Sequence, residues 1–133
     1  MPVMIGQLAR ETSTKVTTIR FYESIGLLRA APRTASGRRT YDAADIERLH
    51  FIRNCRRLGF SVEEIRSLMG LAENPDQDCG AASVIAAHHL KEVEARLTRL
   101  QALRDELELL SQSCTKARMA DCRIMKSIGS GHL

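Results

Sequence analysis

The chain has 133 residues, which suits one domain with an accessory element, and its 44% hydrophobic residues suffice for a packed core. Aromatic residues make up only 4% and tryptophan is missing, which disfavours a large β-sandwich or an aromatic-lined cofactor pocket. Residues 1–57 hold 11 Lys and Arg against 5 Asp and Glu, whereas residues 58–133 hold 9 against 11. A basic front half favours a polyanionic partner, although a solvated charged surface gives the same counts.

We expect a cytoplasmic protein without a membrane partner. Residues 1–10 lack the cationic start and long apolar run of a secretory signal, and no segment approaches the ~20 apolar residues that span a bilayer. Structural disulfides are rare in the cytoplasm. The four cysteines, at positions 55, 79, 114 and 122, therefore indicate metal, redox or core-packing roles.

Two short helices joined by a polar turn open the chain. The first carries Leu8 on its apolar face. The second is predicted from about Lys15 to Ser24, with Ser13 or Thr14 as its N-terminal cap. The apolar residues of the second helix are Val16, Ile19, Phe21 and Tyr22. Such a pair is a candidate helix-turn-helix, which is a weak signal alone because any small α-hairpin produces it.

Residues 27–41 are predicted to form a β-hairpin, or wing, with a flexible tip at Ala35-Ser36-Gly37. Pro32, Gly37 and the weak periodicity argue against a helix there. The segment carries four arginines, at positions 29, 33, 38 and 39.

Two further helices follow the wing. One is predicted to begin at Asp42 and to run to about Leu58, ahead of Gly59, a residue suited to ending a helix. Ser61 and Glu64 have the spacing of a capping box at the start of the other helix, which ends before a break at residues 74–78.

A long helix is predicted from about Ala81 to Ser111, with a short one near Arg123–Ile128. The long helix has a single apolar stripe with steps of three and four residues, close to coiled-coil spacing. The stripe consists of Leu90, Val93, Leu97, Leu100, Leu103, Leu107 and Leu110. A second copy of the chain is the economical cover for it, which predicts a two-fold dimer. The alternative is that the stripe folds back on the N-terminal part of the chain.

Several segments, in this order along the chain, resemble the MerR family of transcriptional regulators. They are Ile5-Gly6-Gln7-Leu8-Ala9, Thr18-Ile19-Arg20-Phe21-Tyr22-Glu23, Gly26-Leu27-Leu28, Gly37-Arg38-Arg39-Thr40-Tyr41, Ile52-Arg53 and Leu58-Gly59-Phe60-Ser61-Val62-Glu63-Glu64-Ile65. The match extends over essentially the whole chain. One departure is Ser13-Thr14, where the family usually has a glycine and an aliphatic residue. Ser13 is therefore expected to adopt a left-handed conformation.

The resemblance implies a mainly α fold: a winged helix-turn-helix head with a small β-hairpin wing, a two-helix connector and a long antiparallel coiled-coil dimerisation helix. We place the DNA-binding domain at residues 1–72, a linker with a metal cysteine at 73–80, the dimerisation helix at 81–112, and a metal-binding loop with a short C-terminal helix at 113–133.

The resemblance also implies a mechanism. A homodimer sits on promoter DNA whose two recognition elements are spaced too far apart, and it holds RNA polymerase in an unproductive complex. Effector binding then makes the dimer bend and untwist the spacer, against an elastic cost of about 1–6 kcal/mol. The activity implied is transcription activation by DNA distortion.

The recognition helix is expected to enter the major groove with its N-terminal residues toward the base edges. Candidate contacts to bases or adjacent phosphates are Lys15, Thr17, Thr18 and Arg20. Tyr22 is a candidate contact to the DNA backbone, with a core aromatic as the alternative. In the wing, the residues expected to hold phosphates are Arg33, Arg38, Arg39 and Tyr41, with solvated charge as the alternative for the arginines.

The antiparallel dimer that the resemblance implies would set the start of one long helix beside the end of the other. Cys79 of one chain would then approach Cys114 and Cys122 of its partner, two cysteines that flank a seven-residue loop. This predicts a three-thiolate metal site, twice per dimer. His89 is a candidate auxiliary ligand, and Cys55 is expected to pack in the core.

Thiolates select soft or borderline ions. Relatives that sense Cu(I) carry Ser at the position of Cys79, so its presence favours a divalent ion. Residues 76–80 and the loop length resemble the cadmium and lead branch, which favours Cd(II) or Pb(II). Mercury sensors share the three cysteines with a longer loop, and zinc sensors add a Cys and a His to the loop. Hg(II), Zn(II) and a redox switch through a Cys114–Cys122 disulfide remain alternatives.

Functions of other classes are less favoured. No Ser/His/Asp or Cys/His set stands in a pocket-forming context, so we do not expect an enzyme. A drug sensor would need a cavity of ~300–1,000 Å³, which the residues after Ser111 are too few to enclose. A metal buffer would need the thiols but not the basic head.

Overall fold

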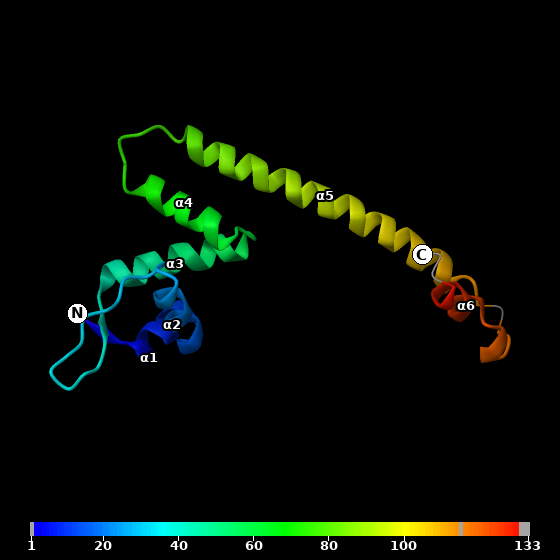
Figure 1. Cartoon of the computed structure of the whole chain (residues 1–133), viewed down its shortest axis with the longest axis horizontal. Coiled ribbons are helices and arrows are strands. Elements are labelled where there is room, and N and C mark those ends of the chain that lie inside the picture. The colour runs from blue at the N-terminus through cyan, green and yellow to red at the C-terminus, as the bar shows by residue number, and fades with distance from the viewer. Residues whose placement is uncertain (1, 115, 131–133) are drawn as a thin grey trace. The chain divides into compact units, whose positions relative to one another are not determined.

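The computed structural model describes residues 2–114 and 116–130 (Figure 1). The described residues fall into two compact units that divide between Ile85 and Ala86, here called the N-terminal unit and the C-terminal unit. The described residues are mainly helical, as the sequence predicted, and they contain one two-stranded sheet. Within the described residues, no helix combines the length and apolarity needed to cross a bilayer.

The N-terminal unit begins with β1 (Val3–Met4), α1 (Ile5–Thr12) and α2 (Val16–Ser24). Ser13, between the two helices, has φ 50° and ψ 40°, which confirms the expected left-handed conformation. The predicted cap of α2 is wrong, because the helix starts after Lys15 without a side-chain cap. Ser13 is committed to the turn, and the Thr14 hydroxyl donates to the Thr12 carbonyl at 3.1 Å instead.

The wing is only partly the hairpin that the sequence predicted. Its strand β2 (Thr40–Tyr41) pairs antiparallel with β1, with Val3 opposite Tyr41, because the first strand of the chain takes that edge. The two arms of the wing meet at one isolated bridge between Arg33 and Arg39. The tip lies where it was expected: Gly37 has φ 85°, and its N–H donates to the carbonyl of Thr34 at 2.9 Å.

Helices α3 (Ala43–Arg57) and α4 (Val62–Ala72) both begin with a capping box. The predicted pair of Ser61 and Glu64 is confirmed, with hydrogen bonds of 3.1 and 2.9 Å. Asp42 caps α3 reciprocally with Asp45, and the hydrogen bond that the Asp45 backbone N–H donates to the Asp42 carboxylate lowers the pKa of Asp42. Gly59, between the two helices, has φ 89°, a conformation that favours glycine.

One apolar core joins these elements. Its most deeply buried members include Leu8 of α1, Ile19 of α2, Leu49 and Ile52 of α3, and Ile65 of α4, all 0% exposed. Cys55 lies in this core as predicted, and burial raises its pKa. Phe21 and Phe51, which the periodicity assigned to apolar faces, are instead 52% and 37% exposed.

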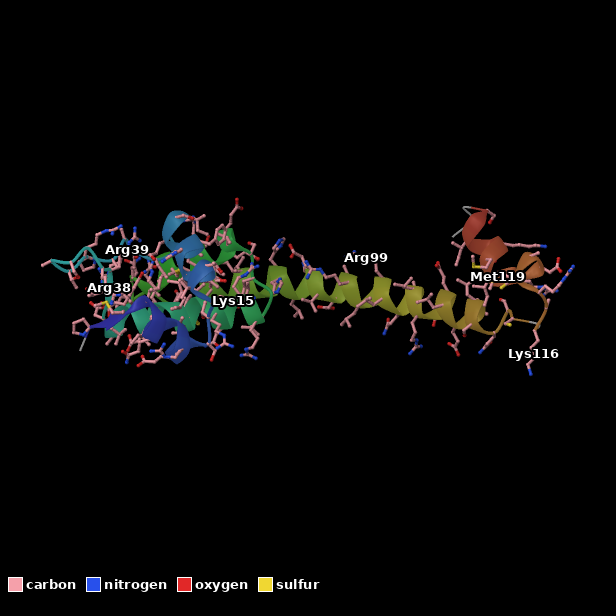
Figure 2. All side chains as sticks on the ribbon, turned by 90° about the horizontal axis from the view of Figure 1, so that it is seen from below. Lys15, Arg38, Arg39, Arg99, Lys116 and Met119 are labelled. Carbon is pink, nitrogen blue, oxygen red and sulfur yellow. The ribbon has the colours of Figure 1, made fainter. Side chains whose placement is uncertain are left out.

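Helix α5 (Gly80–Ser111) is continuous over 32 residues, about 48 Å at the usual helical rise. The 3-10 turn η1 (Met119–Asp121) and α6 (Arg123–Gly129) follow it. Figure 2 shows the side chains of α5, Arg99 among them, projecting from the ribbon. Five stripe leucines are between 49% and 60% exposed: Leu90, Leu97, Leu100, Leu103 and Leu107. The stripe is therefore uncovered in the chain as described.

Candidate functional site

The first face of interest is the start of α2. Lys15, Thr17 and Arg20 are exposed there and Thr18 is half-buried, whereas Ile19 on the opposite side is fully buried. Lys15 is the N-cap residue, so its side chain lies at the end of the helix where backbone N–H groups are not bonded within the helix. Cationic and hydroxyl side chains beside such N–H groups suit a polyanion. The predicted contact residues of this helix are thus accessible together.

Tyr22 lies elsewhere. It is 9% exposed and belongs to the apolar core, with its ring centroid 6.0 Å from that of Phe21. The core position was the alternative that the sequence left open. The exposed aromatic of this helix is Phe21, which the sequence had placed among the apolar residues of the helix.

A second feature is a groove of about 980 Å³ between α1, α2 and the wing. Five arginines of the described chain line it, and Glu23 is the one carboxylate among its lining residues. The arginines are Arg10, Arg20, Arg33, Arg38 and Arg39. Figure 2 shows Arg38 and Arg39 on the wing. Such a balance gives the groove a positive potential that favours anions.

Glu23, near the end of α2, binds two wing residues at once. Its Oε2 accepts a hydrogen bond from Nη1 of Arg39 at 2.5 Å, and its Oε1 accepts one from the hydroxyl of Tyr41 at 2.8 Å. The Glu23 side chain is 4% exposed and Tyr41 is 1% exposed. Burial, and then the Glu23 carboxylate, raise the pKa of Tyr41 to about 12. Sequence reasoning assigned no role to Glu23, because both partners are distant in sequence.

Arginines of the connector helices hold the helix-turn-helix in place. Arg53 of α3 donates to the Thr12 carbonyl at 2.8 Å, and Arg66 of α4 donates to the Ile25 carbonyl. Both carbonyls lie at the C-terminal ends of helices, where a cation is favourable. Nothing in the sequence separates these arginines from solvated ones, so this role was missed.

The cysteines outside the core lie at the two ends of α5. Cys79 immediately precedes the helix and is exposed, Cys114 follows it and is exposed, and Cys122 precedes α6 and is half-buried. All are free thiols, as is Cys55. Within residues 2–114 and 116–130 of a single chain, no three His, Cys, Asp or Glu side chains cluster as metal ligands would. The three-thiolate site therefore stays a prediction.

His89, the candidate auxiliary ligand, is 6% exposed on α5. Its Nδ1 lies 3.7 Å from Oε2 of Glu92, and the neighbouring His88 lies 3.0 Å from Oε1 of the same carboxylate. Both histidines therefore lie beside the Glu92 carboxylate.

Two family models match this chain. The model for MerR helix-turn-helix regulatory proteins matches residues 3–71, and the model described as MerR, DNA binding matches residues 46–110. A transcriptional regulator of Pseudomonas aeruginosa is 39% identical over 127 residues, which is 96% of this chain and 96% of the relative. A probable heavy metal-dependent transcriptional regulator of Haemophilus influenzae is 34% identical over 124 residues, which is 93% of this chain and 97% of that relative.

A solved structure agrees. The transcription regulator PbrR691 from Ralstonia metallidurans, in complex with lead(II), superposes with a TM-score of 0.83 at 36% identity, over 95% of this chain and 98% of that chain. The basic helix-turn-helix on its connector helices defines a DNA-binding transcriptional regulator rather than an enzyme. The chain belongs to the MerR family of regulatory proteins.

Proposed function

We propose that this protein is a metal-responsive regulator that binds promoter DNA as a homodimer and activates transcription by distorting the DNA. The observation that carries the proposal is the separation of the thiols. Cys55 is in the core, whereas the other three cysteines flank a helix whose apolar stripe is exposed. Relatives described as heavy metal-dependent, and a similar structure in complex with lead(II), support a metal effector.

The apolar stripe of α5 supports the dimer. Leucines at half exposure along a helix of about 48 Å leave a long apolar surface open to solvent, which is unfavourable. A second α5 has the matching length and the same coiled-coil spacing. If the two helices run antiparallel, Cys79 of one chain comes near Cys114 and Cys122 of its partner.

The donor set supports a soft divalent ion. Three thiolates disfavour Mg²⁺ and Ca²⁺, and Zn(II) prefers a fourth ligand. We therefore favour Cd(II) or Pb(II), with Hg(II) or Zn(II) as the alternatives. When bound, such an ion would cross-link the ends of two chains through thiolate bonds. His89, beside Glu92, is the candidate for an added ligand on α5, and its role is a proposal.

The N-terminal unit would read the promoter. Lys15, Thr17, Thr18 and Arg20 are proposed to face the bases or adjacent phosphates, and the exposed wing residues Arg33 and Arg38 to hold phosphates. Arg53 and Arg66 would pass a displacement of the connector helices to the ends of α1 and α2, because their hydrogen bonds join these helices. RNA polymerase is the proposed partner on the promoter.

The first test is binding to a pool of random DNA duplexes, followed by transcription from the selected promoter under reducing conditions. We expect selection of two half-sites around a long spacer, and transcription that rises with Cd(II) or Pb(II). A response to Hg(II) or Zn(II) alone would reassign the metal. A response to an oxidant but to no metal would replace metal sensing by the redox alternative.

Mixed dimers test whether the site spans two chains. A Cys79→Ser chain and a Cys114→Ser/Cys122→Ser chain each lack a complete site as homodimers. Mixed together, they should regain one three-thiolate site per dimer, seen as the ultraviolet charge-transfer band on titration with Cd(II). Failure of the mixture to regain it would contradict the shared site. Cys55→Ala is the control and should leave the band intact.

A further inference from the structure

We propose that Glu23 is a positioning residue for DNA binding, and that Arg39 acts as its counter-ion instead of as a phosphate contact. Through these two side chains the recognition helix α2 and the wing move as one body. The inference rests on the proposed DNA binding, and it revises the phosphate role that the sequence suggested for Arg39.

The geometry fixes the wing to the helix at two points. Each oxygen of the Glu23 carboxylate accepts one hydrogen bond, from Arg39 at 2.5 Å and from Tyr41 at 2.8 Å. The two donors are alternate residues of the wing, so their separation along the strand is set. Charge-assisted hydrogen bonds to a carboxylate are short and directional. A two-point attachment of this kind restrains both the position and the direction of the strand.

The attachment extends to the start of the chain. Tyr41 lies opposite Val3 in the pairing of β1 with β2, and β1 leads directly into α1. The carboxylate of α2 therefore holds the wing strand, and the strand holds the N-terminal end of α1. These elements frame the arginine-lined groove.

Charge explains why Arg39 is needed. A carboxylate among five arginines in a groove that faces DNA would repel phosphates and would cost free energy when buried without a partner. Glu23 has 4% of its side chain exposed, and Arg39 lies against it with 37% exposed. The pair is neutral together. The positive potential of the groove is then supplied by the other arginines, among them the exposed Arg33 and Arg38.

A double-mutant cycle separates the two roles of Arg39. Binding of the selected promoter duplex is measured by fluorescence anisotropy over a salt series, for wild type, Arg39→Ala, Glu23→Gln and the double variant. We expect Arg39→Ala to weaken binding by about tenfold or more, in the range of coupled neighbours. The double variant should return to within about threefold of wild type and keep the wild-type salt dependence, because the amide oxygen at position 23 can still accept the Tyr41 hydrogen bond and no phosphate contact has been lost.

Arg38 supplies the matched control, since it is the adjacent residue, carries the same charge and is exposed. Arg38→Ala should lower the salt slope by about one, as expected for one lost phosphate contact. Glu23→Gln combined with Arg38→Ala restores the same net charge but should not restore binding. If it did, the effect would be general charge balance, and the proposed pairing would be wrong.

Two further outcomes overturn the inference. A double variant as weak as Arg39→Ala, with its salt slope lower by about one, would make Arg39 a phosphate contact after all. Unchanged binding by Arg39→Ala would remove its role altogether. Should Arg39→Ala melt below the assay temperature, Arg39→Gln replaces it in the cycle, because its amide still donates to Glu23 without the charge. If the wild type does not bind DNA, the result counts against the proposed function and not against this pairing.

Discussion

The two units differ in how far their apolar side chains are buried. In the N-terminal unit, leucines and isoleucines from four helices reach 0% exposure in one core. Along α5, the stripe leucines remain at 49–60%. The first arrangement is complete within one chain, whereas the second leaves an apolar face exposed, which we propose a second chain covers. Stability should therefore reside in the N-terminal unit and assembly in α5.

The largest effect tests the closed core. Leu49→Ala removes a fully buried side chain of α3 and should lower the free energy of unfolding by about 2–5 kcal/mol, from lost transfer energy and the cavity left behind. Urea denaturation followed by circular dichroism measures it. Leu109→Ala, at 69% exposure on α5, is the control and should stay within about 0.5 kcal/mol. Similar losses in the free energy of unfolding for both variants would contradict the contrast between the core and the α5 surface.

The next test addresses assembly. Leu100→Glu places a charge in the middle of the α5 stripe, where Leu100 is 60% exposed. We expect the dissociation constant of the dimer to rise by about 100-fold. Sedimentation velocity over a dilution series reports the change. Leu109→Glu lies on the same helix but outside the stripe, so it should leave the oligomer intact. A monomeric wild type would show that something other than a second copy covers the stripe.

A smaller effect tests the turn of the helix-turn-helix. Ser13→Val puts a β-branched residue at φ 50° and should cost about 1–2 kcal/mol of folding free energy. Ser13→Gly relieves the left-handed strain and should be neutral or mildly stabilising. Thermal melting compares the two variants. A Ser13→Val variant as stable as wild type would mean that the turn has rearranged.

A further effect appears only at high pH. The pKa of Tyr41 is raised from 10.0 to about 12 in the folded chain, so its stabilising contribution is complete below pH 10 and is lost as the pH rises toward 12. Tyr41→Phe should remove this part of the alkaline decline. At neutral pH it should cost about 1.5–3 kcal/mol, because the lost hydrogen bond is one to a buried carboxylate. Unfolding measured across the pH series decides; parallel curves for the two proteins would contradict the assignment.

Several features were predictable because their causes are local. The capping box of Ser61 and Glu64 is made within four consecutive residues, and the left-handed Ser13 follows from a two-residue departure from a family pattern. The bounds of α5 follow from its periodicity and from the break at residues 74–78. The wing pairing was missed because β2 takes its partner from the first residues of the chain.

By itself, the sequence determined the order of the helices, the basic head, the apolar stripe and the thiols at both ends of α5, because periodicity, charge and spacing are written along the chain. Only the tertiary structure decided which arginines face solvent and which are held internally. Arg39 and Tyr41 reach Glu23 across 16 and 18 residues, and Arg53 and Arg66 each cross 41 residues to a helix end. A positive side chain has the same appearance in sequence whether it meets a phosphate or a buried carboxylate, and folding alone supplies the partner.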